Sequence, residues 1–288
     1  MKKLNLFVFP VLLGMCVLSP APATTQSYRT VTATRVAMGE ESLRLNVEFA
    51  AGILRLGPGD GRTLYQAELY YDHDKFRPVT DYDAATHSLR FGIESRGEGF
   101  KHNKLEHPQR LELTLAPQIP THLTASLAAA EAEFELGGLS LTSIEINSAA
   151  AKARVAFGQP NRVECSELHM QTGAAEFHAE QLGNARCERI VFAGGVGDVT
   201  LDFTGDWADG YGIHEADIKL GLGQLTLRLP KDVGVAIEVD RFLASFDRVG
   251  LTKVGSSYLS DRYDDDDTKL HIILKTVLGD IDIEWVER

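Results

Sequence analysis

The sequence has few cysteines, fewer cations than anions and only one long apolar run, and each shortage excludes a class of protein. The apolar run, "LNLFVFPVLLGMCVL" (4–18), lies near the start of the chain, and no later run approaches the roughly 20 residues that a membrane-spanning helix needs. Lys and Arg number 29 against 41 Asp and Glu, so the formal net charge is -12. This balance argues against nucleic acid and anionic lipid surfaces as partners, because both reward clustered cations.

Sequence motifs of common enzymes are also missing. No G-x-S-x-G, H-E-x-x-H or P-loop pattern occurs. The stretch "GGVGDV" (194–199) has the glycines of a nucleotide-binding loop, but no helix pattern follows it. We therefore expect a protein that is not an enzyme, with no catalytic residue, no cofactor and no dedicated metal site.

The N-terminal segment has the parts of a secretory signal peptide (1–23). Lys2 and Lys3 precede the apolar run, and the small-residue site "APA" ends at Ala23. We expect cleavage after Ala23, which lowers the formal net charge to -14. Cys16 raises the alternative of a lipoprotein, but Met15 is larger than the residue that normally precedes a lipidated cysteine. The sequence thus predicts an extracytoplasmic protein, periplasmic or secreted, with no direct membrane insertion after signal removal.

A small residue followed by alternating apolar residues recurs along the second half of the chain. The first residues of these units, here called the markers, recur at intervals of about 21 to 26 residues, a period that stacked β-rungs produce. A second short strand precedes each marker, such as "SIEINS" (143–148), so we expect each rung to bend at its small residues. The markers are Ala130, Ala151, Ala175, Gly197 and Gly223.

Stacking also predicts which outward side chains become neighbours, since equivalent positions in successive rungs lie about 4.8 Å apart. Opposite charges meet at the first steps of both outward columns, as cross-strand pairing prefers, and the step from Glu176 to Asp198 is unfavourable. The alternative is chance alternation on a charged surface. The first column is Glu131, Lys152, Glu176 and Asp198, and the second is Glu133, Arg154, His178 and Thr200.

After signal removal two cysteines remain, Cys165 and Cys187, at the same phase of neighbouring repeats. Stacked rungs would bring their Cα atoms to about 5 Å, within the range of a disulfide, and an extracytoplasmic compartment permits one. We expect a disulfide between them, and two buried thiols in one column are the alternative. Metal binding by two cysteines alone is not expected, because no other ligand cluster accompanies them.

The flanking segments predict further β-structure. Before the repeats, "GPGDG" (57–61) and "DAATH" (83–87) divide several alternating runs, which is typical of hairpins. At the far end we expect a loop and then a β-hairpin that turns near Gly279. The predicted fold is all-β: a hairpin-rich N-terminal β segment (24–119) that continues into a single β-solenoid with a C-terminal hairpin (120–288).

Several polar clusters have both a functional and a structural interpretation. Paired carboxylates could hold calcium or serve in acid–base chemistry, but the pairs here lack the glycine-centred loop of a calcium site, so solvated turn acids are favoured. The run "DDDD" (264–267) could bind calcium weakly, with a solvated loop as the alternative. His169 and His178 are interpreted as outward ladder residues. The paired carboxylates are Asp72, Asp74, Asp81 and Asp83.

The longest interval between markers contains "GDWADGYG" (205–212), which reads as an insertion at a turn. Insertions in solenoids gather on one face and often bind partners. Trp207 and Tyr211 would suit contacts with sugar or protein in such a binding loop, and an aromatic lid over the core is the alternative.

The stretches "FAAGILRLGPG", "LYQAELYY" and "LRFGIES", together with Pro78, resemble the toast-rack N-terminal domain. The repeats and the ending "VGSSYLSDRYDDDDTKLHIILKTVLGDIDI" resemble the β-solenoid of related adhesin-like and LiaF-type cell-envelope response proteins. The similarity covers about residues 40–285. It implies a single-stranded β-solenoid that works in the cell envelope, although the sequence lacks the transmembrane helices of LiaF-type proteins.

We therefore expect a non-enzymatic β-solenoid, adhesin-like or accessory to a stress response, that binds another envelope protein or associates with itself. One alternative is a polysaccharide-acting enzyme on a parallel β-helix scaffold, which would need clustered acidic and basic residues along a groove. Another alternative is a self-assembling scaffold built by end-to-end stacking of open rungs.

Overall fold

The computed structural model describes residues 28–97, 108–207, 215–265 and 268–287. Strands dominate these residues, whose one helical element is a short 3-10 turn, η1 (Leu182–Ala185). The all-β fold class is therefore confirmed. The strands are β1 (Tyr28–Val36), β2 (Leu43–Pro58), β3 (Thr63–Asp72), β4 (Phe76–Asp83), β5 (Ser88–Ser95), β6 (Arg110–Leu115), β7 (Thr121–Glu135), β8 (Leu141–Ala156), β9 (Cys165–Glu180), β10 (Cys187–Asp202), β11 (Glu215–Pro230), β12 (Gly234–Phe246), β13 (Leu251–Val254), β14 (Ser257–Ser260) and β15 (Lys269–Val286).

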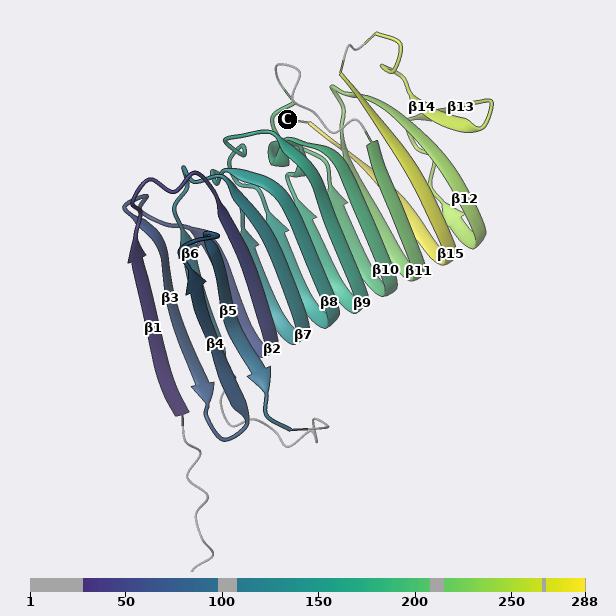
Figure 1. Cartoon of the computed structure of the whole chain (residues 1–288). Helices are drawn as coiled ribbons and strands as arrows, with labels where there is room; N and C mark the ends of the chain where they lie inside the picture. Colours follow the sequence, from purple (N-terminus) through teal and green to yellow (C-terminus); the bar gives the residue numbers. More distant parts are fainter. Residues whose placement is uncertain (1–27, 98–107, 208–214, 266–267, 288) are drawn as a thin grey trace, which may run out of the picture.

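The long strands bend in the middle and stack in parallel, so that each forms one rung of a solenoid (Figure 1). The half of a rung before the bend is called its first arm, and the half after the bend its second arm. In space the rungs follow the order β2, β7, β8, β9, β10, β11, β15, β12. Neighbouring rungs pair along both arms. This stack is the single β-solenoid that the sequence predicts.

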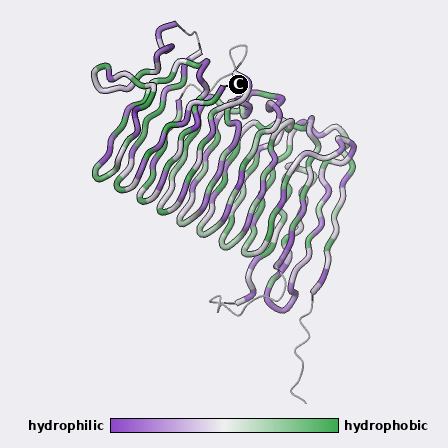
Figure 2. Tube along the Cα trace, turned by 180° about the vertical axis from the view of Figure 1, so that it is seen from behind, coloured by the Kyte–Doolittle hydropathy of each residue, from purple (hydrophilic) through white to green (hydrophobic). Residues whose placement is uncertain are grey.

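The hydrophobic core lies between the two arms, because alternate residues of each arm point inward. Figure 2 shows the alternation of hydrophobic and hydrophilic residues along the rungs. Phe177 on the second arm of β9 and Phe192 on the first arm of β10 meet across this core, with ring centroids 5.4 Å apart. Leu136 and Leu139, in the connection between β7 and β8, are 0% and 1% exposed and close the core opposite the bends.

The markers form one column, as the sequence predicts. Ala130 pairs with Ala151, which pairs with Ala175. Gly197 and Gly223 continue the column. The bend itself comes just before the marker, where the register between β7 and β8 skips one residue of each strand. Small residues therefore line the bend, as expected for a backbone that turns a corner.

The predicted hairpin turn near Gly279 is wrong. β15 is one bent strand, and Gly279 lies beside Gly223 in the marker column. The hairpin of this region is β13–β14, whose strands pair antiparallel. Alternating residues on both sides of a glycine fit a hairpin and a bent rung equally well, so the pattern cannot distinguish them. β15 also lies between β11 and β12, so the last rung in space is not the last in the chain.

At the N-terminal end the two arms belong to separate strands. β5 pairs with the first arm of β2, and β6 pairs with its second arm. β4 extends the first-arm side, while β3 and β1 extend the second-arm side. β2 is itself a full rung and pairs with β7. The sheet therefore continues without interruption across the predicted boundary between the N-terminal segment (24–119) and the solenoid (120–288).

Candidate functional site

A groove of about 890 Å³ follows the first arms of β2, β7, β8 and β9, beside the end of β5. Small residues at the bend, Ala50, Ala128, Ala149 and Gly173, form part of its lining and leave it open. The remaining lining is mainly polar. Its outward polar residues on the rungs are Asn46, Glu48, Ser126, Glu145, Asn147 and Gln171.

The strand alternation positions these polar groups. On β8, Glu145 and Asn147 point outward, while the alternating residues Ile144 and Ile146 are buried in the core. The register then places Asn147 beside Ser126 on one side and Gln171 on the other. Successive rungs thus present hydroxyl and amide groups in a column with a spacing of about 4.8 Å.

Arginines balance two of the carboxylates in the groove. The Arg90 guanidinium donates to Glu48 Oε1 at 2.9 Å, and Arg77 forms an ion pair with Glu94 of β5. A third carboxylate, Glu145, accepts a hydrogen bond of 2.8 Å from the Asn147 amide. The groove is therefore rich in hydrogen-bonding groups without a strong local charge, an arrangement that suits a polar, uncharged ligand surface.

Carboxylates are the ionisable groups that line this groove. Within the described ranges, His, Cys, Asp and Glu form no group of three or more that could hold a metal ion. The hydroxyl, amide and carboxylate groups of the groove can form hydrogen bonds with a ligand.

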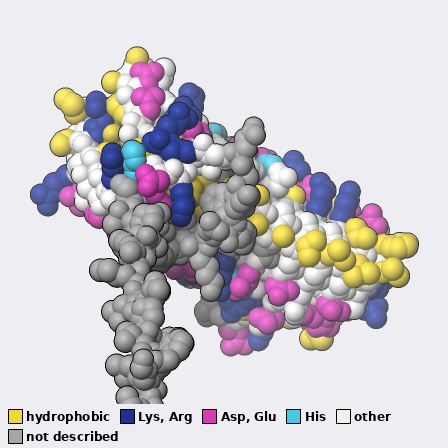
Figure 3. All heavy atoms as spheres, turned by 90° about the horizontal axis from the view of Figure 1, so that it is seen from below, with side chains coloured by type: hydrophobic (Ala, Val, Ile, Leu, Met, Phe, Trp, Pro, Cys, Tyr) yellow, Lys and Arg dark blue, Asp and Glu magenta, His cyan; other side chains and the backbone are white. Residues whose placement is uncertain are grey.

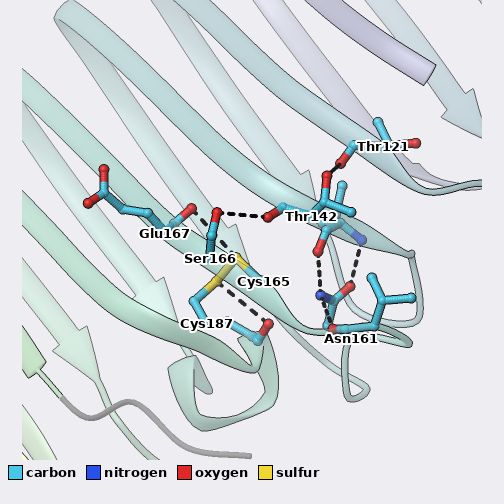
Figure 4. Close-up of a disulfide and its surroundings, with 10 residues drawn as sticks. Thr121, Thr142, Asn161, Cys165, Ser166, Glu167 and Cys187 are labelled. Carbon is cyan, nitrogen blue, oxygen red and sulfur yellow. Dashed lines mark hydrogen bonds between the residues drawn. A yellow bond between two sulfur atoms is a disulfide. The ribbon is translucent and has the colours of Figure 1, made fainter. Parts of the chain in front are cut away.

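Cys165 and Cys187, the predicted disulfide pair, lie side by side at the starts of β9 and β10. Their Cα atoms are 4.1 Å apart, and a disulfide of 2.09 Å joins the two sulfur atoms (Figure 4). Both residues are fully buried. This bond ties two rungs together at the ends of the first arms that lie away from the bends, and it does not line the groove.

Buried asparagines beside the disulfide were missed by the sequence analysis. The Asn161 amide donates to the Leu141 carbonyl at 2.7 Å and accepts from the Leu141 amide at 2.8 Å (Figure 4). One repeat later, the Asn184 amide donates to the Phe157 carbonyl at 2.8 Å. These side chains complete backbone hydrogen bonds where the rungs connect. The sequence feature that could have identified them is a pair of asparagines about one repeat apart, each within a connection between strands.

Trp207 lies in the core, as in the alternative of an aromatic lid, and not in an exposed binding loop. Its side chain is only 3% exposed, and its indole N–H donates to the Phe203 carbonyl at 2.9 Å. Trp207 is thus part of the core, because an insertion next to an open core end can fold its aromatic residue inward. Tyr211, the other residue of the predicted loop, lies outside the described residues.

The acidic clusters act mainly as turn residues. Asp83 accepts hydrogen bonds from the Thr86 hydroxyl at 2.8 Å and the Ala85 amide at 2.9 Å. The hydrogen bond from the Thr86 hydroxyl has the larger effect and that from the Ala85 amide the next, and both lower the pKa of Asp83. Asp72 accepts from the Asp74 amide at 3.0 Å and pairs with Lys75 at 3.3 Å. The run 264–267 lies partly outside the described residues, so weak calcium binding there stays a prediction.

The outward columns stack as the repeat predicts, but the ion pairs of Lys152 and Arg154 form at other steps than the predicted first ones. Lys152 Nζ lies 3.0 Å from Glu176 Oε1, and His178 Nε2 lies 3.2 Å from the same oxygen. The Lys152 contact, followed by the His178 contact, lowers the pKa of Glu176. Arg154 turns away from Glu133 and contacts Glu180 instead. His178 is therefore a ladder residue on the outer face of the second arms.

None of the helical structure in the described residues is long and apolar enough to cross a membrane.

Comparison with known proteins gives one family match and several structural similarities. The family model described as the N-terminal domain of toast_rack, DUF2154, matches residues 22–176. A comparison with curated proteins finds no match.

Three solved structures are similar to this chain at low sequence identity. A "putative cell adhesion protein" from Clostridium sporogenes is 15% identical, with a TM-score of 0.44 over 90% of this chain and 100% of that chain. A "putative adhesin" from Bacteroides fragilis is 11% identical, with a TM-score of 0.35 over 90% and 98%. A "putative lipid binding protein" from Parabacteroides distasonis is 10% identical, with a TM-score of 0.34 over 90% and 96%.

Proposed function

The chain belongs to the toast-rack family, and from this premise we propose that it is a non-enzymatic, adhesin-like binding protein of the cell envelope. Its partner is another component of the envelope, held by hydrogen bonds along the polar groove. The observation that carries this proposal is the column of hydroxyl and amide side chains on neighbouring first arms, Ser126, Asn147 and Gln171.

A rigid β-stack supports such a role. Each rung of the groove is hydrogen-bonded to its neighbours along both arms, so the polar groups are fixed in position before a partner arrives. Preorganisation reduces the entropy that binding must overcome. An extended partner with hydroxyl or amide groups, such as a glycan or an extended peptide, could contact several rungs at once.

A position outside the cytoplasm is part of the same proposal. The sequence of residues 1–23 has the features of a secretory signal, and a disulfide joins Cys165 and Cys187. Disulfides form and persist in oxidising compartments. The periplasm or the cell exterior fits both features.

The enzyme alternative has weaker support. The groove carboxylates Glu48 and Glu94 pair with arginines, and the pKa of Asp83 is lowered by its own turn. A glycoside hydrolase needs one carboxyl group with a raised pKa as its acid. Binding without turnover is therefore the better account of this surface.

The test is a binding assay with residues 24–288 against envelope material of the source organism, separated into polysaccharide and protein fractions. The groove variant is Asn147→Arg with Gln171→Arg, which places two large cations in the column on β8 and β9. The matched control is Thr200→Arg with Thr226→Arg, in neighbouring rungs on the second arms. We expect binding to at least one fraction, a loss of at least tenfold in the groove variant, and no such loss in the control.

The proposal fails if the wild-type chain binds neither fraction, or if both variants lose binding equally. Release of sugar from the polysaccharide fraction by the wild-type chain would instead favour the enzyme.

A further inference from the structure

The bend edge changes character halfway along the solenoid. At the two bend positions ahead of the marker, β2, β7, β8 and β9 carry only alanine or glycine. On β10 and β11 a large apolar side chain occupies the second of these positions, and on β15 and β12 large apolar side chains occupy both. All of these side chains are exposed to solvent. These residues, here called the apolar ridge, are Val196 (51% exposed), Leu222 (42%), Val277 (56%), Leu278 (44%), Phe242 (79%) and Leu243 (63%).

The register makes the apolar ridge continuous. Val196 pairs with Leu222, Leu222 with Leu278, and Leu278 with Leu243. Figure 3, which looks at the bend edge from below, shows hydrophobic side chains gathered at the end of the molecule formed by these rungs. Rungs about 4.8 Å apart thus place the six side chains in one strip.

The bend does not require these large side chains. Alanine and glycine form the same bend in β7, β8 and β9, so the fold accepts small residues there. A contiguous exposed apolar patch with a polar rim is typical of an interaction surface. The ridge therefore points to a partner that covers it.

The two flanks of the ridge carry opposite charges. On the first arms, Lys219 and Lys275 lie side by side, followed by Asp240. On the second arms, the matching outward positions of β10 and β15 carry Asp198 and Asp280. Lys275 and Asp280 thus lie on opposite sides of the same bend, both exposed.

We propose that a second copy of this chain covers the apolar ridge, with the two ridges packed against each other about a two-fold axis parallel to the solenoid axis. This rotation places the first-arm flank of one copy opposite the second-arm flank of the other. Lys275 then faces Asp280 of the second copy, and the same pair forms again on the other side of the axis. An isologous interface requires a surface that is complementary to itself, and these flanks meet that requirement.

The flanks favour a second copy over a lipid surface. An anionic bilayer would reward cations on both sides of the ridge, whereas the second-arm flank carries Asp198 and Asp280. The ridge also lies on other rungs than the polar groove, so the inference goes beyond the proposed function.

Sedimentation velocity of residues 24–288 over a concentration series tests the proposal. We expect a concentration-dependent dimer. Phe242→Ser with Leu278→Ser should weaken dimerisation at least tenfold, because the pair removes the most exposed side chain of the ridge and one that lies between Leu222 and Leu243. The matched control is Val36→Ser with Met38→Ser, which removes two side chains that are 63% and 83% exposed at the other end of the chain and should change nothing.

A charge exchange tests the orientation of the two copies. Lys275→Glu and Asp280→Lys should each weaken the dimer, and the double variant should restore it, because the reversed pair forms again across the same axis. Thermal unfolding of each variant separates loss of the interface from loss of the fold.

A monomer at every concentration, or a dimer insensitive to the ridge variant, would overturn the proposal. So would ridge-dependent flotation of the chain with vesicles of phosphatidylglycerol and phosphatidylethanolamine, which would assign the ridge to a membrane surface. The groove variant Asn147→Arg with Gln171→Arg should dimerise normally, so failure of this proposal is distinguishable from failure of the binding function.

Discussion

Cys187 lies directly beside Cys165 in the parallel register of β9 and β10, with Cα atoms 4.1 Å apart, and a disulfide joins their sulfur atoms. The bond closes a loop with a sequence separation of 22 residues, which stabilises the native state mainly by restricting the unfolded chain. We expect Cys165→Ser with Cys187→Ser to lower the free energy of unfolding by about 3 kcal/mol while the strand content is retained. Urea denaturation followed by circular dichroism measures both. An unchanged midpoint would contradict this role.

Gly279 cannot be replaced by alanine without moving its neighbour. A Cβ atom there would lie 1.8 Å from the Gly223 carbonyl oxygen, and the φ angle of Gly279 is 137°. We expect Gly279→Ala to cost more than about 1 kcal/mol of stability. Gly255→Ala is the matched control, because Gly255 also has a positive φ, 62°, but no atom within 4 Å of the added Cβ. Equal losses of stability in the two variants would show that backbone strain, and not the close approach of the rungs, explains the need for glycine at position 279.

Trp207 contributes to stability through its burial. We expect Trp207→Ala to lower the free energy of unfolding by about 3 to 5 kcal/mol, because it empties a core position and removes the hydrogen bond to the Phe203 carbonyl. Trp207→Phe should recover most of this loss, since it keeps a ring in the core. Chemical denaturation compares the three proteins. A loss of envelope binding with unchanged stability would instead favour the binding loop that the sequence predicted.

The contact between Lys152 and Glu176 should be visible in the titration of the carboxylate. The Lys152 ammonium holds the pKa of Glu176 below its ordinary value, so Lys152→Met should raise that pKa. A lowered pKa in the folded state means that the pair stabilises the fold above the ordinary glutamate pKa and loses this effect as the pH falls through the lowered value. Carboxyl chemical shifts measured by NMR between acidic and neutral pH follow the change directly. His178→Gln is the comparison, with a smaller rise expected, and an unmoved Glu176 titration in Lys152→Met would contradict the contact.

The repeat made much of the fold predictable. Its period alone places Ala130, Ala151 and Ala175 in one column, and the register has the same order. The same period predicted that Lys152 and Glu176 would be neighbours. The repeat pattern was sufficient to predict these neighbours because a solenoid pairs each rung with the next. Positions one repeat apart in the sequence therefore lie side by side in space.

The candidate groove was not predictable in the same way. Asn147 and Gln171 are ordinary outward polar residues in the sequence, and they become part of a groove only because β5 ends beside the bend of β2. For Trp207 the sequence left two interpretations open, a binding loop and an aromatic lid over the core, and only its burial in the structure distinguishes them.

The sequence by itself determined the bent rung, its inward and outward faces and the stacking period, because alternation and small residues at the bend act within a few residues of the chain. Only the tertiary structure decided where the stack ends and which rungs meet. β15 enters between β11 and β12, which brings Leu278 beside both Leu222 and Leu243 and so completes the apolar ridge. This order of rungs depends on pairing between segments far apart in the chain. The local pattern around Gly279 would be the same whichever rung it joined, so it could not predict the position of β15.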